Sequence, residues 1–175
     1  MSYDRLKQRR ENIIKKWKEA ALGDYLNSAF GSPGRQNDRF GNPVVYNISR
    51  GLELIFDELS GRIRTARTDQ ALEDIIKIKS VQVEKPSAAM EFIVRLKDII
   101  REEVGSGGDE NELREILAAI DRLTLDGFDK FMKSRETLYE IRTREMQRRS
   151  YKLLQRAGMN GVASGQEGGM DDDGN

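Results

Sequence analysis

Arginine recurs at every seventh position near the end of the chain, within the stretch RETLYEIRTREMQRRSYKLLQR. The four residues are Arg135, Arg142, Arg149 and Arg156. Seven residues rotate a helix by about 700° at 100° per residue, so the four guanidinium groups stay within roughly 60° of one another on one face. The guanidinium groups of such a row can face water, or they can bind an acidic protein surface or a phosphate backbone.

A second row with the same period is apolar and lies about 40° from the first, when Arg135 is compared with Tyr139. Its members are Leu125, Met132, Tyr139, Met146 and Leu153. Arginine stems pack on apolar neighbours while their charged ends pair with carboxylates, so the double row predicts a docking surface for a protein partner or a second copy of the chain. The predicted docking residues are Met132, Arg135, Tyr139, Arg142, Met146, Arg149, Leu153 and Arg156.

The alternative for the same stretch is a solvated helix face. Pairs four residues apart, Glu140 with Arg144 and Glu145 with Arg149, would then stiffen the helix by about 0.2–0.5 kcal/mol each. The spacing alone leaves both interpretations open.

The composition removes most catalytic chemistry. The chain has no histidine and no cysteine. The usual general base, zinc ligand and proximal haem ligand are therefore missing, as are disulfides and thiolate nucleophiles. An enzyme built from this chain would have to use carboxylates, lysine, tyrosine or serine.

The carboxylates, tyrosines and glycine-rich turns offer weak alternatives. Glu102 with Glu103 could supply oxygen ligands to a divalent cation, but adjacent helical residues face different ways. The stretch GSGGDENE lacks the Lys-Ser/Thr of a phosphate loop and predicts a turn between helices. Tyrosines on amphipathic helices are typical of the edge of a core. We therefore expect no enzyme activity, no catalytic residue, no metal and no cofactor.

Length and charge indicate one largely helical domain. The chain has 175 residues, of which 34% are charged and 7% aromatic. Thirty basic residues balance thirty acidic ones, but four of the acidic residues follow Gly158, so residues 1–157 carry an excess of about four positive charges. That excess is small for a dedicated nucleic-acid binder. No secretory signal or long apolar run occurs, and we expect a cytoplasmic protein that does not span a membrane.

The elements that must position these residues are predicted from helical periodicity and capping signals. The first helix covers residues 3–22, and the second runs from about 43 to 59 with Asn42 as its N-cap and Pro43 in its first turn. Thr68 or Asp69 is expected to cap a third helix through ALEDIIKIKSVQV. Pro86 opens a fourth, PSAAMEFIVRLKDIIREEV.

The last helical region begins at Asp109, which forms a capping box with Glu112. Gly127 is the one obvious place for a kink, so the pattern leaves open one helix or two. The predicted fold is an all-α compact bundle of five or six helices with a long C-terminal helix over residues 1–157, followed by a disordered acidic tail at 158–175. The predicted core residues are Trp17, Phe40, Leu52, Ile55, Phe56, Ile75, Phe92, Leu96, Ile116, Ile120, Phe128 and Phe131.

A signature at residues 37–59, NDRFGNPVVYNISRGLELIFDEL, resembles the N-terminal domain of the RsbRD type of RsbT co-antagonist. The residues that carry the resemblance are Asp38, Phe40, Asn42, Pro43, Val44 and Gly51. Blocks at 75–103 and 128–149 agree in order and spacing, so the similarity covers about residues 3–157.

The resemblance implies a non-enzymatic sensory or regulatory domain, similar to the non-haem globin-like domains of bacterial stress-signalling assemblies. Full-length members of that family join this domain to a STAS domain, for which the sequence after the last predicted helix is too short. As a stand-alone domain, the chain resembles proteins of anaerobic sulfur-metabolising bacteria, and this resemblance implies an association with a membrane complex. The expected partners are another protein or a second copy of this chain, bound through the last helix, and a small-molecule ligand of unknown identity. The alternative function is that of a regulator that binds nucleic acid weakly through the basic first and last helices.

Overall fold

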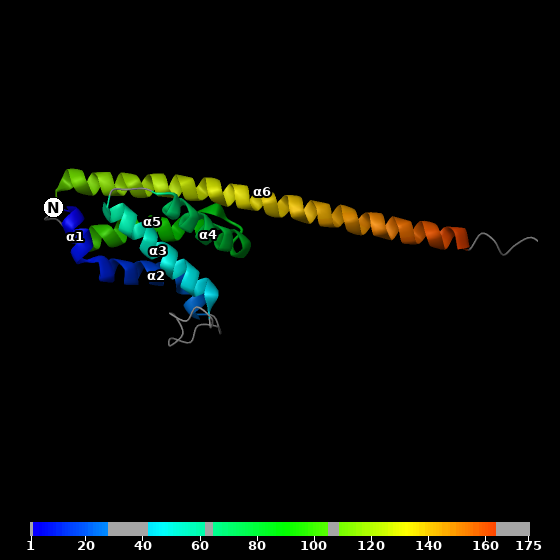
Figure 1. The fold of residues 1–175 in the computed structure, drawn as a ribbon, viewed down its shortest axis with the longest axis horizontal. Helices are drawn as coiled ribbons and strands as arrows, with labels where there is room; N and C mark the ends of the chain where they lie inside the picture. Colours follow the sequence, from blue (N-terminus) through cyan, green and yellow to red (C-terminus); the bar gives the residue numbers. More distant parts are fainter. Residues whose placement is uncertain (1, 28–41, 62–64, 105–108, 164–175) are drawn as a thin grey trace, which may run out of the picture. The chain divides into compact units, whose positions relative to one another are not determined.

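The computed structural model describes residues 2–27, 42–61, 65–104 and 109–163, and all of its elements in those ranges are helices. They are α1 (Ser2–Gln8), α2 (Arg10–Asn27), α3 (Pro43–Gly61), α4 (Ala66–Gln82), α5 (Pro86–Val104) and α6 (Glu110–Ala163) (Figure 1). The predicted all-α bundle with a long C-terminal helix is confirmed. The chain divides into two units, residues 1–135 and residues 136–175, which are described separately below.

Side-chain caps start three of the helices. The Asn42 side chain accepts a hydrogen bond from the Val45 amide at 3.2 Å, and the Asp109 carboxylate accepts one from the Asn111 amide at 2.9 Å. Both predicted caps are thus confirmed, and they fix the first turns of α3 and α6.

The predicted cap of α4 is wrong by one turn. Thr65 is the N-cap, and its hydroxyl accepts a hydrogen bond from the Arg67 amide at 3.2 Å. The Glu58 carboxylate of α3 accepts hydrogen bonds from the Thr65 amide, at 2.6 Å, and from its hydroxyl. This tertiary contact selects Thr65, whereas Thr68 lies buried inside the first turns of the helix.

The first predicted helix is divided into α1 and α2 by a turn at Arg9. Backbone hydrogen bonds continue across the turn, from Arg9 to Arg5 at 2.8 Å and from Ile13 to Arg9 at 3.0 Å. The apolar residues Leu6, Ile13 and Trp17, on both sides of this turn, are all buried.

Gly127 does not break α6, which is a single helix from Glu110 to Ala163. A Cβ atom at this position would lie 2.9 Å from the Met90 sulfur and 3.1 Å from Cδ1 of Ile93. Glycine therefore leaves room here for the side chains of α5. The sequence left open one helix or two, and the structure has one.

Large apolar side chains fill the core of residues 1–135. Trp17 is fully buried, donates its indole N–H to the Phe92 carbonyl at 2.8 Å and stacks on the Phe92 ring, with ring centres 6.3 Å apart. Phe128 was predicted in the core but is 43% exposed, because it lies about 100° around the helix from Gly127, which faces α5. Of the other predicted core residues, Phe40 lies outside the described residues and the rest are buried: Trp17, Leu52, Ile55, Phe56, Ile75, Phe92, Leu96, Ile116, Ile120 and Phe131.

The signature residues have structural roles where the structure describes them. Val44 packs against the core, and a Cβ atom at Gly51 would lie 2.9 Å from Cδ1 of Ile75, so α3 and α4 come into close contact there. Asp38 and Phe40 lie outside the described residues. The predicted tail boundary at 158 lies within α6, and residues 164–175 are also outside the described part.

Candidate docking surface on helix α6

The half of α6 that belongs to residues 1–135 is held against α4 and α5. Ile116, Ile120, Leu123 and Phe131 are buried along its inner side. Ion pairs join Asp121 to Lys97 at 2.7 Å and Lys130 to Glu73 at 3.9 Å. This half of the helix is therefore part of the folded bundle.

The half of α6 in the second unit has mostly exposed side chains. Every residue from 139 to 158 is exposed. The exposed fractions are 54% for Tyr139, 69% for Met146 and 63% for Leu153. Exposed large apolar residues at a regular helical spacing are unusual in a protein without a partner.

Six residues in this half form what we call the Tyr139–Arg156 face. They are Tyr139, Arg142, Met146, Arg149, Leu153 and Arg156, and all six are exposed. Because α6 is continuous over this range, their spacing places apolar and cationic side chains on one side of the helix.

Arg135, the first arginine of the predicted docking set, has a different environment. It is half-buried, and its guanidinium donates a hydrogen bond to the Ser80 carbonyl at 3.2 Å. Ser80 lies in the last turn of α4, where carbonyl groups lack helical donors, so Arg135 contributes to capping α4. Met132, also in the first unit, is 39% exposed. Arg135 and Ser80 are 55 residues apart in the sequence, so helical spacing could not predict their hydrogen bond.

The second half of α6 is strongly basic. Residues 136–158 contain six basic side chains and three acidic ones. The basic residues are Arg142, Arg144, Arg148, Arg149, Lys152 and Arg156, and the acidic ones are Glu136, Glu140 and Glu145. The predicted pair between Glu140 and Arg144 is present at 3.3 Å, and it lies on the side of α6 opposite the Tyr139–Arg156 face.

Carboxylates from neighbouring helices pair with several cations of α2. Arg10 forms two hydrogen bonds with the Asp57 carboxylate of α3, at 2.7 and 3.0 Å, and this contact raises the pKa of Arg10. Lys18 pairs with Glu53 of α3 at 2.6 Å. Much of the charge of the first helical region is thus used within the bundle, which the sequence did not reveal.

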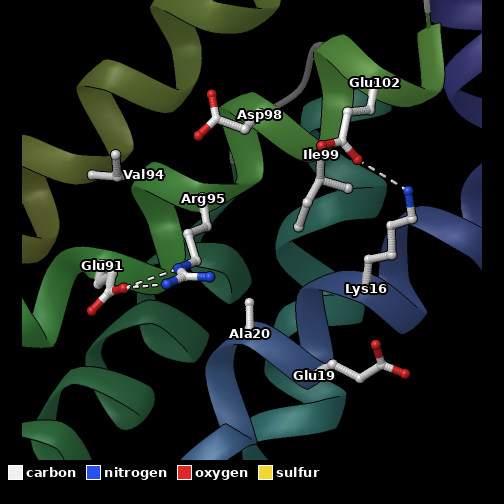
Figure 2. Close-up of a pocket in the computed structure, with 9 residues that line it drawn as sticks. All are labelled: Lys16, Glu19, Ala20, Glu91, Val94, Arg95, Asp98, Ile99 and Glu102. Atoms are coloured by element: carbon white, nitrogen blue, oxygen red, sulfur yellow. Dashed lines mark hydrogen bonds and ion pairs between the residues drawn. The ribbon is translucent and has the colours of Figure 1, made fainter.

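A surface groove between α2 and α5 is a second candidate site. It has a volume of about 760 Å³, and its lining is mainly charged (Figure 2). Lys16 pairs there with Glu102 at 3.1 Å, and Arg95 pairs with Glu91 at 2.7 Å. Hydrogen bonds to Glu103 and Glu102 also raise the pKa of Lys16. These contacts tie α5 to itself and to α2, so the groove has an evident structural role.

Two further searches concern metal and membrane binding. Within the ranges that the structure describes, no group of three or more His, Cys, Asp or Glu side chains is arranged to hold a metal ion. In the same ranges, none of the helices combines the length and apolar character needed to cross a membrane.

Comparisons with known proteins give no match. No protein-family model matches the chain, and neither a curated protein nor a solved structure is similar to it at a significant level. The functional argument therefore depends on the residues and their geometry.

Proposed function

We propose that the chain is a non-enzymatic bacterial signalling or regulatory module, of the kind suggested by its resemblance to the RsbRD N-terminal domain. In this proposal it acts by docking to a protein through the Tyr139–Arg156 face of α6. The observation that carries the proposal is the exposure of Tyr139, Met146 and Leu153 on a basic helix.

Energetic considerations support docking over a solvated face. A helix without tertiary contacts is only marginally stable in water, since most helical stability in proteins comes from packing. Burying the side chains of Tyr139, Met146 and Leu153 against a partner would contribute about 1.5–3 kcal/mol each. The aliphatic stems of the neighbouring arginines add to the apolar area while their ends stay hydrated or pair with carboxylates.

The sensing part of the proposal concerns residues 1–135. A ligand or partner that binds there would have to act on packed helices, and the groove between α2 and α5 offers apolar contact at Val94 and Ile99. The groove is open to solvent and has a volume of about 760 Å³. In this proposal the groove receives the signal, and α6 carries the docking face.

Weak nucleic-acid binding is the competing proposal. It required the basic residues of both the first and the last helices, but Arg10, Lys16 and Lys18 pair with carboxylates of the bundle. Phosphate binding would then depend on α6 alone. It would also lose affinity steeply as salt rises, because each neutralised phosphate releases counterions.

The test of docking is the double change Met146→Glu with Arg149→Glu. The expected result is loss of self-association in sedimentation, or loss of partner capture from native lysate, while circular dichroism and the melting temperature stay nearly constant. Both residues are exposed, so the bundle should not be affected. If both association assays are unchanged, the arginines face only water and the proposal is wrong.

A further inference from the structure

The repeat on the Tyr139–Arg156 face indicates what shape of partner it binds. Apolar residues recur at 139, 146 and 153, and arginines at 142, 149 and 156. A strict seven-residue repeat drifts by about 20° per heptad on a straight helix, and two helices that supercoil around each other keep such a repeat in contact. Over residues 139–153 the drift amounts to about 40°, which a second helix follows by supercoiling, so the repeat fits another α-helix.

The positions of the carboxylates indicate what charge that helix carries. Glu140 lies nine residues before Arg149, which at about 100° per residue places the two on opposite sides of α6. Glu140 pairs with Arg144 on that far side at 3.3 Å. Only Glu145 lies within about 40° of Arg149. The Tyr139–Arg156 face is therefore cationic, with little compensation from its own helix.

The bundle provides an internal comparison. Where α2 presents cations, carboxylates on the helix packed beside it meet them, as in the two hydrogen bonds between Arg10 and Asp57. A complementary helix for the Tyr139–Arg156 face would supply carboxylates in the same way. Arginine forks bind carboxylates with two parallel hydrogen bonds, which would fix the register of such a pair.

A second copy of α6 is a poor complement. Two copies in contact would bring Arg142, Arg149 and Arg156 of one chain close to the same residues of the other. Glu145 of each copy could offset only part of that repulsion, and like-charge contacts at an interface cost several kcal/mol. The charge pattern therefore favours a different protein.

We propose that the Tyr139–Arg156 face binds an acidic amphipathic α-helix of another protein. The partner helix would carry apolar residues that pack on Tyr139, Met146 and Leu153, and carboxylates at heptad spacing that pair with the arginines. This inference rests on the proposed docking function and specifies the chemistry of the partner.

The experiment uses the full chain and two synthetic peptides of identical composition. One peptide places leucine and glutamate at heptad spacing, and the other has the same residues in scrambled order. Fluorescence anisotropy at physiological salt should show at least tenfold tighter binding of the heptad peptide. The change Arg142→Glu with Arg149→Glu should abolish this preference, whereas the matched change Arg144→Glu with Arg148→Glu, on the opposite side of α6, should preserve it.

Four outcomes would overturn the inference. Equal binding of the scrambled peptide, or equal loss in the two charge-matched variants, would mean that the helix attracts any polyanion without recognising a partner helix. If the heptad peptide fails to bind while sedimentation shows a dimer that Arg142→Glu with Arg149→Glu abolishes, the occupant is a second copy; the docking function then stands without an acidic partner. Absence of both kinds of association would refute the docking function as well.

Discussion

Replacing Gly127 by alanine tests the close packing of α6 on α5. The new Cβ atom would lie 2.9 Å from the Met90 sulfur and 3.1 Å from Cδ1 of Ile93, both closer than ordinary van der Waals contact. Overpacking of this kind costs about 1–3 kcal/mol, whereas exchanging glycine for alanine within a helix gains about 1 kcal/mol. The expected result is a net loss of about 1 kcal/mol in the free energy of unfolding.

The matched control is Gly23→Ala in α2, where no atom of the described residues, apart from the helix's own backbone, lies within 4 Å of the new Cβ position. This variant should be unchanged or stabilised by up to about 1 kcal/mol. Chemical denaturation of both variants at equal temperature gives the comparison. If Gly127→Ala is as stable as Gly23→Ala, the Met90 and Ile93 side chains or α6 itself can shift without cost, and the packing argument is wrong.

Three further predictions concern the bundle. Asn42→Ala should lower the free energy of unfolding by about 1 kcal/mol through loss of the N-cap of α3, and a silent result in chemical denaturation would contradict the assignment. Lys79→Met should cost about 1–3 kcal/mol, because the buried Lys79 amine donates to the Ala21 carbonyl at 2.8 Å and its loss leaves that carbonyl without this donor. The hydrogen bond from Lys77 lowers the pKa of Glu73. The pair therefore stabilises the fold above the unfolded-state pKa of Glu73, and this contribution is lost as the pH falls through the lowered folded-state pKa. Lys77→Gln should raise the pKa of Glu73 in an NMR titration, and an unchanged pKa would refute the pairing.

The helices and most of the core could be predicted from the sequence because these features depend on local spacing. Apolar residues three and four apart mark a buried side, and this pattern located Leu52, Phe56, Phe92 and Leu96. Caps are local as well, so Asn42 and Asp109 were correctly assigned. The start of α4 was missed because a residue of another helix, Glu58, selects Thr65 as the cap.

The candidate site was predicted in part. Heptad spacing located Tyr139, Met146 and Leu153, and the structure places them on one exposed side of a continuous helix. The contact between Arg135 and the Ser80 carbonyl is a tertiary hydrogen bond, and periodicity cannot distinguish such an arginine from a solvent-facing one. Gly127 was noted only as a place for a kink, since its packing against the side chains of α5 is visible only in the folded structure.

Hydrogen exchange by mass spectrometry on the full chain tests the docking of α6 most directly. The free protein should exchange rapidly over residues 139–156, because the side chains of this part of α6 are exposed, and slowly over the buried helices α3 and α5. Addition of the acidic heptad peptide should slow exchange over residues 139–156 and leave α3 and α5 unchanged. Protection confined to the bundle, or none at all in the presence of saturating peptide, would contradict docking of an acidic helix on the Tyr139–Arg156 face.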